Sequence, residues 1–186
     1  MEEDGEAGDE GLADTIREAT RNLSRSLELL DRLLRLPPDR PEPAPLSLAD
    51  SVGFIAALHR AHRTNIQLDV SSAVAGSLPA VRGMEHELEQ ILLNLLLNAL
   101  RSIGDRDAGT VLIRAEPADG VVQLVVEDDG AGLAPELGER LFEPKETGGL
   151  GLPVSRALAE RMGGRLEWER REGRGARFWL TLARWR

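Results

Sequence analysis

Two asparagines, Asn94 and Asn98, lie four residues apart in the otherwise apolar stretch NLLLNAL. On a helix of about 3.6 residues per turn they share one narrow face with Gln90 and Arg101, while the leucines point elsewhere. An asparagine oxygen is a neutral, hard ligand suited to Mg²⁺, and an arginine one turn further on can contact a phosphate. The alternative is a set of solvent-facing residues on an ordinary amphipathic helix.

An acidic turn with two glycines, DDGAG, follows the hydrophobic run 121–126. This run predicts a strand that ends at Asp128, where Gly130 and Gly132 let the backbone turn away without side chains that block approach. Asp128 can then accept a hydrogen bond from an exocyclic amine such as that of adenine. The alternative is a common Asp-Gly hairpin turn.

A second glycine turn, GGLGL, precedes another predicted helix. Free backbone N–H groups and the positive end of the helix dipole can meet phosphates there, and the glycines permit close approach. Lys145, the only lysine of the chain, lies just before this turn with Thr147. The alternative is a flexible loop with a solvated lysine. The residues of the turn are Gly148, Gly149, Leu150, Gly151 and Leu152.

The hydrophobic periodicity predicts the elements that must position these residues. The pattern indicates helices over 48–63, 85–102 and 152–162, strands over 66–70, 110–115, 121–127, 165–170 and 176–182, and an extended piece near residue 80. Strands and helices are interleaved and the late strands follow one another, which predicts a mixed sheet covered by helices on one face.

The first 45 residues have a different character. Residues 1–11 carry six acids and no base, and are predicted to be a disordered tail. An apolar stripe over 12–36 predicts a long amphipathic helix whose stripe must pack against a partner, which suggests a homodimer. Five prolines within 37–45 predict a stiff linker before a domain at 46–186.

Composition excludes several classes of function. The chain has no cysteine, which rules out disulfides and thiol catalysis, and its three histidines are scattered. A net charge of −9 is a poor match for nucleic acid. The acidic N-terminus and the short apolar runs predict no signal peptide and no membrane contact, so we expect a cytoplasmic location.

The order and spacing of four motifs resemble the ATP-binding catalytic domain of sensor histidine kinases of the nitrogen-regulation type. This domain belongs to the superfamily that includes gyrase, the Hsp90 chaperones and MutL. The motifs are ELEQILLNLLLNAL (N box), DDGAGL (G1 box), LFEP (F box) and GGLGL (G2 box), within residues 46–182. The resemblance implies a two-layer α/β sandwich of the Bergerat type, with a mixed sheet, preceded here by the long N-terminal helix.

The resemblance also implies ATP and Mg²⁺ as cofactors and assigns roles to residues. Asn98 looks like the Mg²⁺ ligand, with Asn94 and Arg101 as its neighbours on the phosphate side. Asp128 looks like the adenine anchor. The implied adenine pocket and triphosphate side consist of Gly130, Gly132, Lys145, Thr147, Gly148, Gly149, Leu150, Gly151 and Leu152.

One position separates transfer from hydrolysis. The ATP-hydrolysing relatives carry a glutamate general base where this chain has Asn94, and an amide cannot take a proton from water. Transfer of the γ-phosphoryl to a histidine, and then to a response regulator, is therefore the expected activity. The alternatives are an ATP-dependent binding module without phosphotransfer and a serine kinase of the anti-sigma type.

The chain departs from the family pattern in two places. Only residues 145–148 separate LFEP from GLGL, so the loop that covers ATP is short, and Thr147 occupies the first glycine position of the G2 box. No histidine has the sequence context of a phosphoacceptor, since His59, His62 and His86 lie in or near helices of the ATP domain. We expect a truncated chain or an atypical dimerisation region, with an acceptor supplied elsewhere as one alternative and lost phosphotransfer as another.

Overall fold

The structure, a computed structural model, describes residues 42–61, 65–71, 78–104, 106, 108–133, 140–143 and 150–186. The predicted acidic tail and the predicted helix over 12–36 lie outside the described residues, as does the linker up to residue 41. The last two linker residues belong to strand β1 (Ala44–Leu46), which pairs antiparallel with β3 (Val81–Gly83). This small sheet explains the extended piece predicted near residue 80.

The main sheet has five strands in the order β2-β4-β5-β7-β6. Strand β2 pairs parallel with β4, and the remaining pairs are antiparallel, so the sheet is mixed. The strands are β2 (Ile66–Val70), β4 (Gly109–Ala118), β5 (Val121–Asp128), β6 (Arg165–Arg170) and β7 (Ala176–Ala183).

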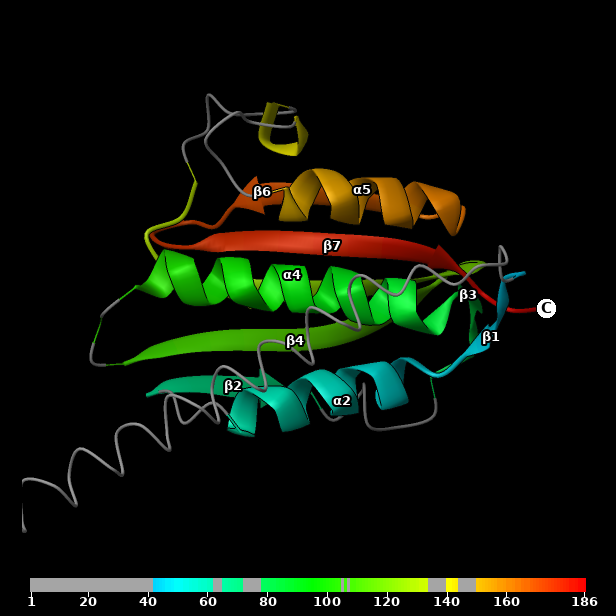
Figure 1. Cartoon of the computed structure of the whole chain (residues 1–186), viewed down its shortest axis with the longest axis horizontal. Coiled ribbons are helices and arrows are strands. Elements are labelled where there is room, and N and C mark those ends of the chain that lie inside the picture. Colours follow the sequence, from blue (N-terminus) through cyan, green and yellow to red (C-terminus); the bar gives the residue numbers. More distant parts are fainter. Residues whose placement is uncertain are drawn as a thin grey trace, which may run out of the picture. The chain divides into compact units, whose positions relative to one another are not determined.

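Three helices cover one face of this sheet: α2 (Leu48–Ala61), α4 (Glu85–Ile103) and α5 (Gly151–Arg161) (Figure 1). Apolar residues alternate along the central strands, and those facing the helices are buried because period-two alternation places them on one face. The buried strand residues are Val111, Ile113, Ala115, Val122, Leu124, Val126, Phe178, Leu180 and Leu182. The fold is a two-layer α/β sandwich, which confirms the predicted class.

The apolar stripe of α4 is the centre of this core. Leu88, Ile91, Leu92 and Leu95 are at most 1% exposed. The polar face of α4, which carries Asn94 and Asn98, is therefore turned away from the sheet, as the helical spacing predicts. No helix among the described residues is long and apolar enough to cross a membrane.

Candidate functional site

Helix α4 connects the motifs that the sequence singled out. Asn94, Asn98 and Ser102 follow one another at four-residue steps along it, so their Cα atoms span about 12 Å of helix axis. Asn94 contacts the start of α5, and Ser102 contacts the turn after β5. One rigid element thereby fixes the distance between the predicted phosphate side and the predicted adenine side.

Asn94 attaches α5 to α4. Its Nδ2 donates hydrogen bonds to the carbonyl oxygen of Gly151 at 3.1 Å and to Ser155 Oγ at 3.0 Å. Ser155 is fully buried, so the contact lies at the base of the first turn of α5. A Cβ added to Gly151 would lie 3.4 Å from the Asn94 amide carbon, so the Asn94 side chain packs directly against the start of α5. The amide nitrogen is committed as a donor.

Asn98 is the only predicted metal ligand, and its amide is partly unsatisfied. Arg101 Nη1 donates to Asn98 Oδ1 at 3.2 Å, whereas Nδ2 of Asn98 is buried and has no hydrogen-bond partner among the described residues. A half-turn of the amide would point the oxygen into that position, and Arg101, which donates to that oxygen here, would then have to turn away. The described residues contain no cluster of three or more acidic or histidine ligands. A single amide oxygen fits Mg²⁺, which retains waters and binds phosphate oxygens.

Asp128 ends β5 as predicted and is only 3% exposed. Its Oδ1 accepts a hydrogen bond from the N–H of Gly130 at 2.9 Å, and the carboxylate also accepts from Ser102 and from the N–H of Ala176. Burial raises the pKa of Asp128 above its ordinary value despite these donors. Because a carboxylate offers about four acceptor positions, three internal donors leave room for one more, such as an amine of a ligand.

Ser102 is a site residue that the sequence reasoning missed. Its hydroxyl donates to the Asp128 carboxylate, and its oxygen accepts from the N–H of Gly132 at 3.3 Å. Its carbonyl oxygen accepts from Ala131 N at 2.9 Å. The end of α4 therefore holds both the acid and its turn. The available signal was spacing, since Ser102 continues the four-residue step from Asn94 and Asn98.

The two glycines of the acidic turn are required for close packing. A Cβ at Gly130 would overlap Ser102, and a Cβ at Gly132, where φ is +77°, would lie 2.8 Å from the carbonyl oxygen of Gly175. Neighbouring protein fills the space that these glycines leave. They permit close packing of the turn against α4 and the β6–β7 turn, and their role beside an adenine stays a prediction.

Among the three consecutive acids at the end of β5, the pKa of the middle one, Asp128, is raised, and the pKa values of Glu127 and Asp129 are lowered. Burial alone would raise the pKa of Glu127, but Arg114 and Arg177 outweigh it and hold that pKa below its usual range. Hydrogen bonds from Thr110 N and Arg106 likewise outweigh burial and lower the pKa of Asp129. Asp128, between them, faces the opposite side of the strand from Glu127 and has the raised pKa.

The F box packs against the start of α5. Leu141 and Phe142 are buried, and the guanidinium of Arg156 lies 5.0 Å from the centre of the Phe142 ring. Leu150, at the N-terminal end of α5, is 59% exposed, and Leu152 is half-buried. The remaining predicted residues of this side lie outside the described residues: Lys145, Thr147, Gly148 and Gly149.

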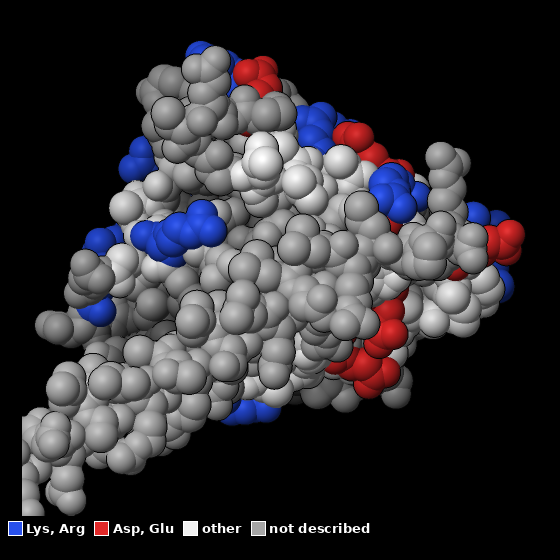
Figure 2. Space-filling view, in the orientation of Figure 1, with Lys and Arg blue, Asp and Glu red and all other residues white. Residues whose placement is uncertain are grey.

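Positive charge surrounds the end of α4. Figure 2 shows that the charged side chains in view at the left, beside this end of the helix, are basic. Arg101 on α4 and Arg106 after it contribute there, along with Arg171 and Arg174, which donate to backbone carbonyls of the acidic turn. Arg106 and Arg171 are also paired with Asp129 and Glu127, so these arginines hold the acidic turn in place on the predicted adenine side of the site.

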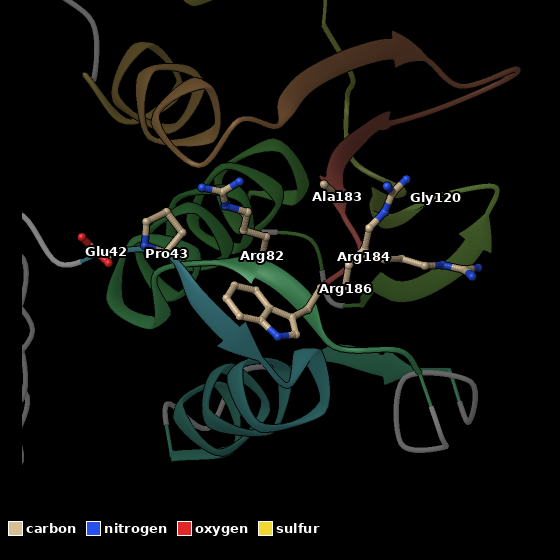
Figure 3. Close-up of a pocket in the computed structure, with 8 residues that line it drawn as sticks. Glu42, Pro43, Arg82, Gly120, Ala183, Arg184 and Arg186 are labelled. Atoms are coloured by element: carbon tan, nitrogen blue, oxygen red, sulfur yellow. The ribbon is translucent and has the colours of Figure 1, made fainter.

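A separate pocket of about 750 Å³ lies at the other end of β5, beside Gly120. Arg82, Arg184 and Arg186 line it, and none of them has a carboxylate partner among the described residues. In Figure 3 the side chains of Arg82 and Arg184 point away from each other. They do not surround a common point at which one anion would be held. The pocket is therefore distinct from the site built on α4.

Comparison with known proteins identifies similar chains. A model of the family described as histidine kinase-, DNA gyrase B-, and HSP90-like ATPase matches residues 83–186. The C4-dicarboxylate transport sensor protein DctB of Rhizobium meliloti is 40% identical over 114 residues, which cover 53% of this chain and 18% of DctB. The sensor histidine kinase AruS of Pseudomonas aeruginosa is 33% identical over 165 residues, which cover 78% of this chain and 16% of AruS.

Solved structures agree with the fold. The catalytic domain of histidine kinase ThkA is 25% identical with a TM-score of 0.66, covering 77% of this chain and 98% of that one. Full-length ShkA in complex with AMPPNP is 31% identical with a TM-score of 0.65, covering 95% of this chain and 39% of ShkA. The chain spans about a fifth of the length of the curated relatives that it matches.

Proposed function

Because the chain belongs to the histidine kinase-, DNA gyrase B-, and HSP90-like ATPase family, we propose that it is the ATP-binding catalytic region of a two-component sensor histidine kinase. It transfers the γ-phosphoryl group of ATP to a histidine, from which the group passes to a response regulator. The observation that carries this proposal is the position of α4, which contacts the G2-box helix through Asn94 and the G1-box turn through Ser102. Both ends of a nucleotide can then be held by one helix.

Within this proposal each residue has a role. Asp128 accepts a hydrogen bond from the adenine amine, and its turn is shaped by Gly130 and Gly132. Asn94 and Arg101 lie on the phosphate side. The remaining phosphate-side residues are Lys145, Thr147, Gly148, Gly149, Leu150, Gly151 and Leu152. The free N–H groups at the start of α5, which has no acid in its first turn, suit a phosphate there.

Asn98 is proposed as the protein ligand of Mg²⁺. Its amide has one buried atom without a partner among the described residues, and its other polar atom is within reach of Arg101. A Mg²⁺ ion held by Asn98 would supply neutralisation of the phosphate charge. Arg101 is then free to turn from Asn98 towards a phosphate, where a planar guanidinium binds two oxygens at once.

Phosphoryl transfer is favoured over hydrolysis of ATP by water. Asn94 stands where a hydrolase would need a general base, and an amide has no basic site at neutral pH. Its nitrogen is also fully used as a donor to Gly151 and Ser155. What the site supplies is positioning and charge neutralisation, which are the main requirements of phosphoryl transfer.

The rest of the proposal concerns the whole chain. Residues 46–186 form the catalytic domain, and the helix over 12–36, joined to it by the linker over 37–45, pairs two copies. Nitrogen-regulation sensor kinases are the proposed subtype, on the strength of the four boxes. The partner is a response regulator, the segment contacts neither nucleic acid nor membrane, and its location is cytoplasmic.

The test is transfer of label from γ-³²P-ATP to the chain, or to an added acceptor-helix peptide of a sensor kinase. We expect an acid-labile, base-stable label, as for phosphohistidine. Asn98→Ala and Asp128→Ala should each abolish ATP binding measured by calorimetry. Unchanged affinity in both variants contradicts the site, and an acid-stable label on serine points instead to a serine kinase.

A second candidate is an ATP-dependent binding module without phosphotransfer. The specific observation in its favour concerns the described histidines. His59 in α2 is only 8% exposed, and His86 lies in the first turn of α4 beside Glu85 and Glu87, so neither is placed as an acceptor. ATP binding without transfer to any supplied acceptor supports this candidate and contradicts the kinase.

A further inference from the structure

The turn between β6 and β7 donates side-chain hydrogen bonds to the acidic turn that follows β5. Arg171 Nη1 donates to the carbonyl oxygen of Asp128 at 2.8 Å, and Arg174 Nε donates to the carbonyl oxygen of Gly130 at 3.2 Å. These two arginines come from residues 171–175, which none of the sequence motifs includes. Two carbonyl groups of the acidic turn therefore depend on a distant segment for their hydrogen bonds.

Gly175 brings the two backbones together. Its φ is +90°, and a Cβ there would overlap the carbonyl oxygen of Asp128. From the other side, a Cβ on Gly132 would lie 2.8 Å from the carbonyl oxygen of Gly175. The acidic turn and the β6–β7 turn thus meet at two points where side chains are excluded. Gly173, two residues earlier, also has a positive φ of +81°, but the space around its missing side chain is open.

Arg171 is itself held in place from the open face of the sheet. Its Nε lies 3.3 Å from Glu127 Oε2, and Glu127 also binds Arg114 and Arg177. Glu127 is only 5% exposed, so this ion cluster is partly shielded from water. A guanidinium fixed at one edge points its other N–H groups in a defined direction, here towards Asp128.

The β6–β7 turn also sets a hydrogen bond to the Asp128 carboxylate. The donor is the N–H of Ala176, the residue after Gly175. With the donors from Gly130 and Ser102, it determines which acceptor position of the carboxylate stays open. A displacement of the β6–β7 turn therefore changes the direction in which Asp128 can accept a ligand amine.

We propose that Arg171, Arg174 and Gly175 are positioning residues for base recognition, and that the β6–β7 turn sets the preference of this site for adenine over guanine. The proposal rests on the proposed function, because it takes Asp128 as the adenine anchor. A hydrogen bond from the adenine amine is lost if the carboxylate shifts, whereas contacts to the triphosphate at the other end of α4 remain. A guanine nucleotide has no amine at that position, so it gains nothing from a well-placed Asp128.

The experiment compares Gly175→Ala with Gly173→Ala in the full chain. Both changes put an alanine at a positive φ and carry a similar backbone cost, but only the first meets the acidic turn. Dissociation constants for ATP and GTP, each with Mg²⁺, are measured by calorimetry. We expect Gly175→Ala to weaken ATP by about tenfold or more and leave GTP within twofold, as one lost hydrogen bond to a charged group implies. Gly173→Ala should leave both within twofold.

Arg174→Ala provides the test if Gly175→Ala does not fold. Arg165→Ala is its control, because Arg165 pairs with Glu167 on β6, away from the acidic turn. We expect Arg174→Ala to weaken ATP by about threefold to tenfold and to lower the ATP-to-GTP preference. Equal weakening of ATP and GTP indicates a structural defect alone and overturns the proposal. If Asp128→Ala loses affinity for ATP while Gly175→Ala and Arg174→Ala keep the wild-type preference for ATP over GTP, this proposal alone is overturned. A wild-type chain that binds no ATP overturns the proposed function as well.

Discussion

At the scale of single residues, the three consecutive acids Glu127, Asp128 and Asp129 at the end of β5 point in different directions and have different partners. Glu127 faces the open side of the sheet and has three arginine partners. Asp128 faces the helices, is buried, and receives hydrogen bonds but forms no ion pair with the side chains that the structure describes. Asp129 turns back to Arg106 and the backbone of Thr110. The acid without a direct cation is the one placed to bind a neutral base.

The contributions of Asp128 and Glu127 to the free energy of unfolding should change with pH in opposite directions. The pKa of Asp128 is raised above 3.8 in the folded state. Ionisation of this carboxyl therefore lowers the free energy of unfolding, and the loss grows as the pH rises from 3.8 through the folded-state pKa. The free energy of unfolding of Asp128→Asn, relative to wild type, should therefore increase from pH 4 to pH 7.5. The folded-state pKa of Glu127 is lowered, so its contribution is present above 4.5 and is lost as pH falls below that value. Glu127→Gln should cost about 2 kcal/mol at neutral pH.

Urea unfolding of both variants at several pH values between 4 and 7.5 measures these differences. Each variant serves as the other's control, because they change neighbouring residues with the same loss of one charge. A pH-independent difference for Asp128→Asn would mean that the carboxylate is not buried as described. A Glu127→Gln variant as stable as wild type at neutral pH would mean that the arginine cluster contributes nothing to folding.

Part of the site was predictable at this scale and part was not. Asn94, Asn98 and Asp128 stand out because polar residues interrupt apolar runs at helical or strand spacing. Ser102 carries only the weak signal of continuing the four-residue step, since a serine near a helix end is otherwise unremarkable. Gly175 is hidden for a different reason. Its partner is the carbonyl of Asp128, 47 positions away, and only the register of β5 with β7 brings them together.

At the scale of elements, α4 organises the molecule. Its apolar stripe is buried against the sheet, and its polar face contacts α5 through Asn94 and the acidic turn through Ser102. The main helices and strands were predictable because their apolar periodicity is strong and long. The β1–β3 pair and the short turn at Leu141 were not, since three-residue elements carry too little pattern. Their positions depend on contacts distant in sequence.

The contact between α4 and α5 can be tested with an isosteric pair. Asn94→Asp replaces a donor with an acceptor opposite the carbonyl of Gly151, so the first turn of α5 should loosen. We expect a loss of about 1.5 kcal/mol and roughly 5 °C in Tm. Hydrogen exchange of the amides over 151–155 should be faster. Asn98→Asp, one turn further on, is the matched control, because its amide nitrogen has no partner among the described residues.

In the control, exchange over 151–155 should match wild type. Equal acceleration in both variants would show that added charge on α4, and not the lost contact with Gly151, loosens α5. Unchanged exchange in Asn94→Asp would show that α5 is held in place by its buried residues alone, such as Leu158 and Ala159.

At the scale of the whole molecule, binding and assembly are expected to reside in different parts of the chain. The residues proposed to hold ATP all lie beyond residue 90. The apolar stripe predicted to need a partner lies within 12–36, where leucines recur at three- and four-residue steps, including Leu23, Leu27 and Leu30. A carboxylate in that stripe should therefore separate two copies without changing the affinity for nucleotide.

The variant Leu23→Asp/Leu30→Asp tests this division. Two buried charges per helix are incompatible with a dry helix interface, so light scattering should give the mass of a monomer where the wild-type chain gives that of a dimer. The Kd for ATP should remain within about twofold of wild type. Arg25→Asp places a carboxylate on the opposite face of the predicted helix and should remain dimeric. If it dissociates as well, helix charge and not the stripe governs assembly. A monomeric wild-type chain would show that the stripe packs within its own molecule.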